Sequence, residues 1–494
     1  MQKNIFELFS LWVLKTPEKT ALVYEDKCIS YKNLYEDVLT LSFYLNNSGV
    51  TKGSHVAIFS NNTLEFATIL LSLAQLGAVA IALPLTLKSN ARLTALRKSD
   101  VEFVIGWFSV INQLNEDDNF TCKGFVSLAQ KADNALFFDE IMHEKKEFKT
   151  DYGVEISSPF ILTLTSGSTG KPKPIILTQE TKILRSITGT KDFYGLTKDD
   201  TVLVSTPLYH SLAQRSLLLP LMIGATAVIL PKFTPNGWIQ SIVKEKVSFL
   251  FAVSTQLDLL LKEKHLNQYD FSSLKTIVSS SALLKNESKE KLIKLFNANI
   301  HECYGTSEIG VATSISLSCK TDKLGSVGKA LPYVSIKLDN ETNEILCKSA
   351  TAFSGYYLQQ KNTNESFTED GYFKTGDIGF LDQDDYLYYK GRINDVIITG
   401  GINVYPQDIE RVLNSLESVK ETAVIGVEDE YFGEIILAVI VAKKDTIIKI
   451  SELRKACLSN LTDYQQPQQY EVVKGLPKTA LGKVMKNTLK DMLL

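Results

Sequence analysis

The sequence has few of the residues that build metal centres or disulfide-linked folds. Its 494 residues include only six cysteines and five histidines. The cysteines are scattered and form no Cys-x-x-Cys pair, so we expect the reduced thiols of a cytosolic protein and no zinc site. The histidines are too dispersed along the chain to predict a metal cluster.

An excess of charge is absent as well. Lys and Arg number 53 against 56 Asp and Glu, which gives a formal net charge of −3 at pH 7. This balance predicts neither a nucleic acid nor an anionic membrane as a partner. The hydrophobic content of 44% and the charged content of 22% are typical of a globular protein. Since a single core stops growing near ~250–300 residues, the length predicts more than one domain.

We expect neither a signal peptide nor a membrane-spanning segment. No apolar core with a small-residue cleavage site follows the N-terminus. Residues 66–87 carry no charge, but a glutamine, a glycine and a proline interrupt them. We therefore expect a buried helix over residues 64–76 and a strand over residues 78–83 in place of a membrane span, and a cytoplasmic location.

Helices alternate with short apolar strands up to about residue 320, for example at residues 201–205 and 226–230. This alternation predicts largely parallel sheets with helices on both faces. Residues 322–390 have short strands and frequent Asp, Asn and Gly turns, which predicts a β-rich subdomain. We expect an α/β fold with a large N-terminal domain, residues 1–392, and a small mobile α+β C-terminal domain, residues 393–494.

A segment rich in hydroxyl groups and glycine lies between two apolar runs, residues 160–164 and 175–178, which we expect to be strands. It consists of Thr165, Ser166, Gly167, Ser168, Thr169, Gly170 and Lys171. Glycines let backbone N–H groups converge on one ligand, hydroxyls add donors and the lysine adds charge, so the segment predicts a polyphosphate site. It is not a Walker A loop, because Thr165 replaces the first glycine and Pro172 replaces the Mg-binding hydroxyl residue. A flexible surface loop is the alternative.

Further motifs follow in order along the chain. They are residues 304–308 (Tyr-Gly-Thr-Ser-Glu), 375–377 (Thr-Gly-Asp), 391–392 (Gly-Arg), 400–406 (Gly-Gly-Ile-Asn-Val-Tyr-Pro) and 477–483 (Pro-Lys-Thr-Ala-Leu-Gly-Lys). Together with residues 165–171, they make the chain resemble the adenylate-forming superfamily of acyl- and aryl-CoA synthetases, peptide-synthetase adenylation domains and firefly luciferases. The resemblance extends from about Phe6 to Lys486. Each motif alone is a weak signal, whereas five in this order are a strong one.

The resemblance implies an enzyme that activates a carboxylic acid with ATP and Mg2+. The carboxylate attacks the α-phosphorus to give acyl-AMP and pyrophosphate, and the thiol of coenzyme A then displaces AMP. Because both steps concentrate negative charge, the site needs cations and hydrogen-bond donors more than a proton-transfer dyad.

Roles in binding Mg-ATP are implied for residues of the first two motifs and for Ser281. Residues 165–171 would hold the β- and γ-phosphates, and Thr306 would bond to the α-phosphate. Tyr304, followed by Gly305, would stack on adenine in a pocket that Ser281 and its neighbours line. Glu308 would position Mg2+, which needs only one or two carboxylates.

The remaining implied roles belong to the C-terminal half of the chain. Asp377 would accept hydrogen bonds from the ribose hydroxyls, and Arg392 would assist at ribose or phosphate. Lys483 would stabilise the charge between the substrate carboxylate and the α-phosphate. Asn394 lies where the family has a hinge, about which the C-terminal domain is implied to swing between the two reactions.

Each of these residues alone also has a plain structural interpretation. Tyr304 suits a core, Glu308 a helix N-terminus, Asp377 an ordinary turn and Lys483 a solvated surface. Their joint occurrence is what favours a site.

Residues 207–210, Pro-Leu-Tyr-His, resemble the acyl- and aryl-CoA ligase form of the substrate motif. His210 is implied to lie beside the substrate carboxylate; a buried histidine at a strand end is the alternative. Relatives that activate amino acids carry an Asp there, so we do not expect an α-amino acid. Arg215 would meet a second carboxylate of a dicarboxylic acid, but a surface or structural arginine is favoured by roughly three to one.

We predict an acid–thiol ligase that converts a small-molecule carboxylic acid to its acyl-CoA. One alternative is an enzyme that loads the phosphopantetheine of an acyl carrier protein. A catalytically idle nucleotide-binding module is the other, and the presence of Glu308, Asp377, Arg392 and Lys483 argues against it.

Overall fold

The computed structural model describes residues 3–146, 152–165, 173–318, 321–479 and 482–493, and it forms two compact units. The first unit comprises Met1–Leu324, Leu331–Val334 and Ser349–Glu365, and the second comprises Gly325–Ala330, Ser335–Lys348 and Ser366–Leu494. In these described ranges, no helix combines the length and the hydropathy that crossing a bilayer requires. The predicted division at residues 392/393 concerns movement between reaction steps and stays a prediction.

One sheet of the first unit is the parallel sheet that the helix–strand alternation predicted. Its strands lie in the order β15 (Gly310–Ser316), β14 (Asn299–Thr306), β13 (Thr276–Ser280), β12 (Phe249–Val253), β10 (Thr201–Val204), β11 (Thr226–Ile229), β1 (Thr20–Tyr24) and β2 (Lys27–Ser30). Pairing is parallel from β14 to β1, while β15 and β2 are antiparallel to their neighbours. The C-terminal ends of β10, β13 and β14 therefore share one edge, where open α/β sheets bind ligands.

A second sheet of the first unit carries the predicted phosphate segment. Its order is β19 (Gly355–Tyr356), β9 (Lys173–Thr178), β8 (Pro159–Thr165), β4 (Val79–Leu83), β3 (His55–Phe59), β5 (Phe103–Trp107), β6 (Gly124–Leu128) and β7 (Leu136–Phe137). β8 to β7 pair in parallel, and β9 and β19 are antiparallel to their neighbours.

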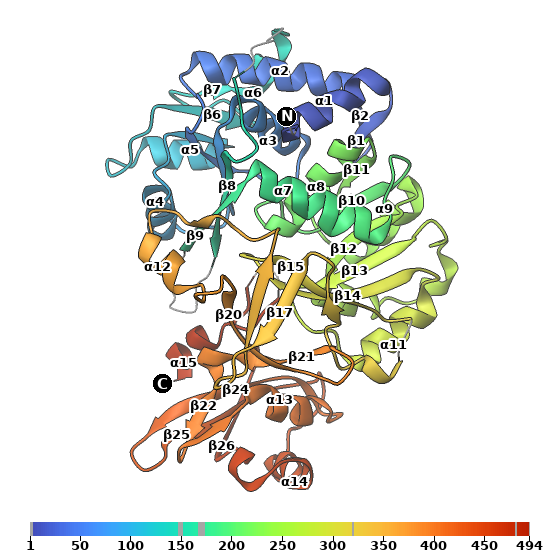
Figure 1. Cartoon of the computed structure of the whole chain (residues 1–494), viewed down its shortest axis with the longest axis vertical. Helices are drawn as coiled ribbons and strands as arrows, with labels where there is room; N and C mark the ends of the chain where they lie inside the picture. Colours follow the sequence, from blue (N-terminus) through green and yellow to red (C-terminus); the bar gives the residue numbers. More distant parts are fainter. Residues whose placement is uncertain (1–2, 147–151, 166–172, 319–320, 480–481, 494) are drawn as a thin grey trace. The chain divides into compact units, whose positions relative to one another are not determined.

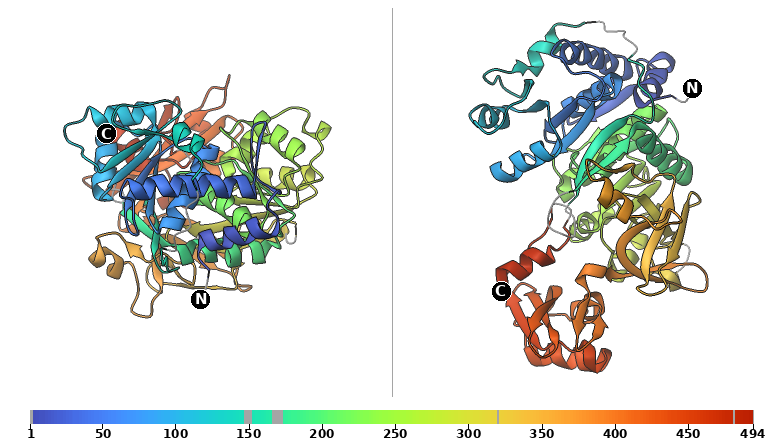
Figure 2. Two further views of the ribbon diagram at one scale, coloured as in Figure 1. Left: turned by 90° about the horizontal axis from the view of Figure 1, so that it is seen from above. Right: turned by 60° about the vertical axis from the view of Figure 1, so that its left-hand side comes forward.

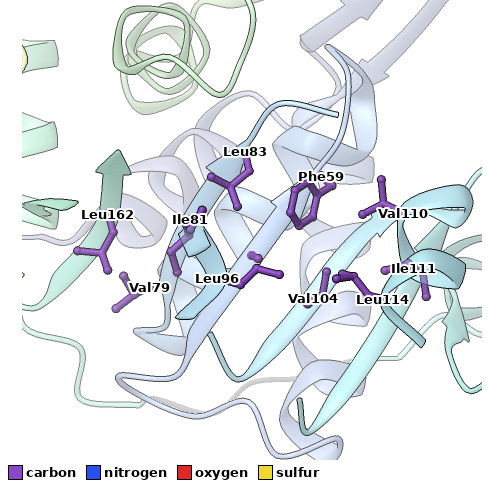
Figure 3. Close-up of a cluster of buried hydrophobic side chains, with 12 residues drawn as sticks. Phe59, Val79, Ile81, Leu83, Leu96, Val104, Val110, Ile111, Leu114 and Leu162 are labelled. Atoms are coloured by element: carbon purple, nitrogen blue, oxygen red, sulfur yellow. The ribbon is translucent and has the colours of Figure 1, made fainter. Parts of the chain in front are cut away.

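The core of this second sheet lies under helices α4 (Ser89–Lys98) and α5 (Phe108–Asn115). Side chains such as Ile81 and Val104 from the strands cluster with Leu96 of α4 and Ile111 of α5 (Figure 3). Each fully buried side chain of this kind contributes ~1.5–3 kcal/mol. That apolar packing fixes the strand from which the phosphate segment leaves.

Helices α1 (Ile5–Lys15), α2 (Tyr31–Asn47) and α3 (Leu64–Leu76) pack against one another (Figures 1 and 2). The helix predicted over residues 64–76 is confirmed as α3. It ends at Gly77, whose φ of 69° is a left-handed conformation that glycine adopts without strain. The other helices of this unit are α6 (Phe138–His143), α7 (Gln179–Ser186), α8 (Ser211–Ile223), α9 (Pro235–Glu245), α10 (Ser254–Leu260), α11 (Asn286–Leu295) and α12 (Gln360–Glu365).

The second unit contains the β-rich part and the α+β part that the sequence predicted. Its first sheet has the order β17 (Val334–Leu338), β18 (Glu344–Ser349), β20 (Phe373–Leu381) and β21 (Leu387–Arg392). The other sheet joins β23 (Ile402–Val404), β22 (Ile397–Thr399), β25 (Gly433–Ala442), β24 (Val419–Asp429) and β26 (Gln469–Val473), with helices α13 (Pro406–Asn414), α14 (Ile450–Asn460) and α15 (Lys486–Leu493). α13 begins at Pro406, as predicted, and buries Ile409 and Leu413 against the sheet. The predicted α/β fold class is confirmed.

Candidate functional site

The predicted phosphate segment joins two paired strands. Thr165 ends β8, Lys173 begins β9, and these two residues are antiparallel backbone partners. The strands expected on either side of the segment are therefore present. The six residues Ser166, Gly167, Ser168, Thr169, Gly170 and Lys171 lie outside the described residues.

The Tyr304–Glu308 motif forms a tight connection between β14 and β15. Gly305 faces the backbone so closely that an added Cβ would lie 1.9 Å from the carbonyl oxygen of Gly310. The hydroxyl of Thr306 accepts a hydrogen bond from the Ile309 N–H at 3.2 Å, which closes the turn. Ser307, which the sequence analysis did not single out, exposes its side chain in the same turn. Tyr304 is largely buried at the end of β14.

Glu308 is tied to the strand that follows the phosphate segment. The Tyr356 hydroxyl donates to Oε1 of Glu308 at 3.1 Å. Tyr356 belongs to β19, which pairs with β9, and the ammonium group of Lys173 lies 5.1 Å from the centre of its ring. Glu308 thus lies in a turn between strands, and the alternative of a carboxylate at a helix N-terminus is wrong.

Arg185 of α7 holds the same turn from its other side. Its Nη2 donates to the carbonyl oxygen of Glu308 at 2.8 Å, and its Nε donates to the carbonyl oxygen of Thr351 at 2.9 Å. Burial and the positive charge of Arg215 lower the pKa of Arg185 to about 9. No sequence pattern indicates this role, because 123 residues separate Arg185 from Glu308.

His210 lies at the N-terminus of α8, immediately before the first helical residue. Its Nε2 is buried without a hydrogen-bond partner among the residues described. Burial lowers the pKa of His210 to about 4, so the imidazole is neutral at pH 7. A neutral ring that still has a free nitrogen at a helix N-terminus suits an anionic ligand, because the helix dipole adds positive potential there. The alternative of a histidine at a strand end is not what the fold shows.

Ser281 follows the last residue of β13 and has an exposed side chain. Its φ of +76° is a conformation that residues other than glycine rarely adopt. Such strain costs ~1–3 kcal/mol and concentrates at functional sites. Because β13 ends at Ser280, Ser281 lies at the C-terminal edge of the parallel sheet, as do His210 and the Tyr304–Glu308 turn.

Asp377 and Arg392 are direct neighbours in the second unit. They are cross-strand partners on β20 and β21, and Arg392 Nε lies 3.2 Å from Asp377 Oδ1. Asp377 is only 4% exposed, and its N–H donates to the hydroxyl of Thr375 at 3.1 Å. An arginine at this distance from a carboxylate fixes the orientation of the carboxylate. The alternative of an ordinary exposed turn residue does not describe Asp377.

Lys483 belongs to the loop before α15 in the second unit. Its N–H donates to the Thr479 hydroxyl at 3.2 Å, and the ion pair of Lys486 with Glu410, at 2.7 Å, anchors the start of the helix. The side chain of Lys483 reaches solvent, yet the atoms around it desolvate the ammonium group and lower its pKa. Arg392 lowers that pKa further and Asp377 opposes the change, so the three predicted residues of this unit share one electrostatic neighbourhood.

The predicted residues thus fall into two groups, one in each unit. Thr165, Ser281, Tyr304, Thr306, Glu308 and His210 belong to the first, and Asp377, Arg392 and Lys483 to the second. Throughout the part of the chain that the structure describes, no cluster of three or more His, Cys, Asp or Glu side chains suits a metal ion. Glu308 is the candidate for Mg2+, whose usual sites need one or two carboxylates because water and phosphate supply the other ligands.

Comparisons with known proteins agree with this arrangement. The sequence matches the AMP-binding enzyme family over residues 9–357 and the AMP-binding enzyme C-terminal domain over residues 408–483. It is 31% identical to the 2-succinylbenzoate–CoA ligase of Listeria monocytogenes serotype 4b (strain F2365), over 96% of this chain and 97% of the relative.

Two solved structures share the fold over nearly their whole length. ATP-bound MatB from Rhodopseudomonas palustris has a TM-score of 0.90 and 26% identity, with 99% of each chain covered. The o-succinylbenzoate CoA synthetase of Bacillus subtilis, in complex with its acyl-adenylate intermediate, has a TM-score of 0.88 and 27% identity, covering 99% of this chain and 98% of the other. The resemblance to adenylate-forming acyl- and aryl-CoA synthetases is confirmed, and the chain belongs to the AMP-binding enzyme family.

Proposed function

We propose that the protein is an acid–CoA ligase that forms an acyl adenylate from a small-molecule carboxylic acid and then an acyl-CoA. The observation that carries this proposal is the hydrogen bond from Tyr356 to Glu308. It couples the candidate Mg2+ ligand to the strand that follows the phosphate segment, although the two lie far apart in the sequence.

In the first step the substrate carboxylate attacks the α-phosphorus of ATP, and pyrophosphate leaves. Residues 165–171 hold the β- and γ-phosphates, and Thr306 hydrogen-bonds to the α-phosphate. Glu308 would hold Mg2+, which would supply positive charge against the leaving pyrophosphate. The neutral imidazole of His210 orients the substrate carboxylate at the N-terminus of α8 through its unpartnered Nε2.

Further residues of the motifs have proposed roles at the nucleoside and at the reaction centre. Tyr304 stacks on adenine next to Gly305 and Ser281, and Asp377, which lies 3.2 Å from Arg392 Nε, accepts hydrogen bonds from the ribose hydroxyls. Lys483 bridges the substrate carboxylate and the α-phosphate, where negative charge grows in the transition state.

In the second step the sulfur of coenzyme A attacks the acyl carbonyl, and AMP leaves with the bonding electrons. We assign the change between the two steps to rotation of residues 393–494 about Asn394, which lies in a short 3-10 turn, Ile393–Asp395. The use of ATP and coenzyme A supports a cytosolic enzyme, and 2-succinylbenzoate, named for one relative, is a first acid to test.

Isotope exchange between pyrophosphate and ATP tests the proposal. A panel of carboxylic acids without coenzyme A should reveal acid-dependent exchange, and coenzyme A should then convert the active acid to a thioester. Exchange without thioester formation would favour an acyl carrier protein as the acceptor. Absence of exchange with every acid would leave only nucleotide binding and would refute the ligase.

A further inference from the structure

Three basic side chains are buried together between α7 and α8 of the first unit. Lys182 and Arg185 of α7 are 1% and 2% exposed, and Arg215 of α8 is 5% exposed. Lys182 and Arg185 each have a pKa lowered by burial and by the positive charge of their neighbours. Of the two interpretations favoured for Arg215, a surface or a structural arginine, the surface position is therefore wrong.

Arg215 makes no hydrogen bond and no ion pair within the described part of the chain, and its Nε is buried and unpartnered. Its guanidinium carbon lies 5.6 Å from the centre of the Phe251 ring. A guanidinium has five N–H donors, and a buried ion that lacks partners costs several kcal/mol. A side chain in this state is suited to an anion that arrives as a ligand.

The two neighbouring cations, Lys182 and Arg185, differ in how many of their hydrogen-bond donors are used. The ammonium group of Lys182 makes one hydrogen bond, to Oε1 of Gln214 at 3.2 Å, which leaves two of its three donors unused within the described chain. Arg185 donates hydrogen bonds to the carbonyl oxygens of Thr351 and Glu308. None of the three cations contacts a carboxylate side chain among the described residues, so the cluster has no counter-charge at bonding distance.

The cluster adjoins the proposed acid site. Arg215 lies five residues after His210 on α8, which corresponds to about 7.5 Å along the helix axis. Between them, Leu212 packs on a cluster that includes Phe251 and Cys303, and Cys303 directly precedes Tyr304. The side chains between the two residues are apolar, so they suit contact with the carbon body of an acid and not with a polyphosphate chain.

We propose that the acid carries a second carboxylate, which Arg215 binds with the help of Lys182 at the inner end of the acid site. The inference rests on the proposed function and names its substrate class, a dicarboxylic acid whose two ends lie several carbons apart. A site built to pair with a charge also rejects an acid that lacks it, because the buried arginine then stays unpaired.

Matched pairs of acids test the inference in the exchange assay. The pairs are 2-succinylbenzoate with 4-oxo-4-phenylbutanoate, adipate with hexanoate, and 1,4-phenylenediacetate with phenylacetate. We expect the best dicarboxylate to exceed its partner in kcat/KM by at least about a hundredfold. Equal or better use of the monocarboxylate in every pair would overturn the inference and leave the ligase intact. If none of the acids supported exchange, the ligase itself would be refuted.

Variants of the cluster locate the second carboxylate. Arg215→Met should lower kcat/KM for the active dicarboxylate about a hundredfold, change that of the matched monocarboxylate less than about threefold, and leave the KM for ATP unchanged. Arg215→Lys should restore part of the loss. A rise in the KM for ATP, or equal losses for both acids, would assign the arginine to the phosphates or to the fold and would overturn the inference.

Two further variants separate recognition from folding. Arg92 of α4 is a buried arginine whose guanidinium bonds to Gln113 and Leu87, and Arg92→Met should lower the melting temperature without changing the preference between acids. Lys182→Met should weaken use of the dicarboxylate about tenfold, so the inference stays testable if Arg215→Met does not fold. Unchanged discrimination in Lys182→Met and Arg215→Lys together would contradict it.

Discussion

Buried polar side chains of the first unit differ in how many of their hydrogen-bonding atoms have partners within the fold. Gln179 is buried and uses both ends of its amide, accepting from Ile5 N–H and donating to the Ala74 carbonyl oxygen. His210 and Arg215 are held in place as well, but each keeps a buried nitrogen without a partner among the described residues. Since native proteins satisfy most buried polar atoms, such exceptions mark positions where a ligand completes the bonding.

Lys483 is the residue to which a single-site prediction applies most directly. Lys483→Ala should reduce acid-dependent pyrophosphate exchange at least about a hundredfold, because one preorganised charge is removed from the transition state. Thioester formation from preformed acyl-AMP should survive far better. Lys478 of the same loop pairs with Glu421, so Lys478→Ala is the matched control and should keep both activities. Equal loss of pyrophosphate exchange and of thioester formation in Lys483→Ala would count against a role of Lys483 in the first step alone.

At the scale of elements, pairing of strands assembles the phosphate end of the site. β19 is only two residues long, yet it adds to the edge of β9 and places Tyr356 where its hydroxyl reaches Glu308. The carboxylate that would hold Mg2+ is thereby oriented by a neighbouring hydroxyl group. Outer partners of this kind typically change metal affinity 10–100-fold.

Tyr356→Phe tests that arrangement, because it removes only the hydroxyl. The concentration of Mg2+ that gives half-maximal exchange should rise about tenfold, while the KM for the acid stays the same. Tyr357→Phe is the control, since the adjacent Tyr357 donates to Asp100 on the surface and should behave like the unmodified protein. An unchanged Mg2+ requirement in Tyr356→Phe would show that the hydrogen bond does not position Glu308.

At the scale of the whole molecule, two partly buried histidines, His210 and His301, link stability to pH. Burial lowers the pKa of both His210 and His301 to about 4. In the unfolded chain these groups titrate near 6.5, so below that pH the unfolded state binds more protons than the folded state. The contribution of these two histidines to stability is therefore complete above about pH 6.5 and is lost as the pH falls toward 4.

Urea unfolding at a series of pH values measures this effect. The free energy of unfolding should drop by about 2 kcal/mol per histidine between pH 7.5 and pH 5. Replacing both His210 and His301 with Asn should flatten the profile in this window. His143 lies at the end of α6 and shows no such burial, so His143→Asn should retain the slope. If the double replacement left the pH dependence of the unfolding free energy unchanged, that dependence would have to come from the carboxylates.

The sequence alone was enough for the class of fold and for the motifs. Apolar periodicity and glycine stops predicted α3, the strands β8 and β9 and the parallel sheet, because local pattern governs those elements. The order of motifs predicted the family, and it named Asp377 and Arg392 without showing that they are neighbours across two strands.

Only the tertiary structure decided how these residues act on one another. Arg185 reaches Glu308, and Tyr356 reaches it from another element, over separations of 123 and 48 residues that no local pattern encodes. The burial of Lys182 and Arg215 is likewise set by the packing of α7 against α8. A charged side chain has the same sequence signature at a surface as in an interior, and its energy in the two places differs by several kcal/mol.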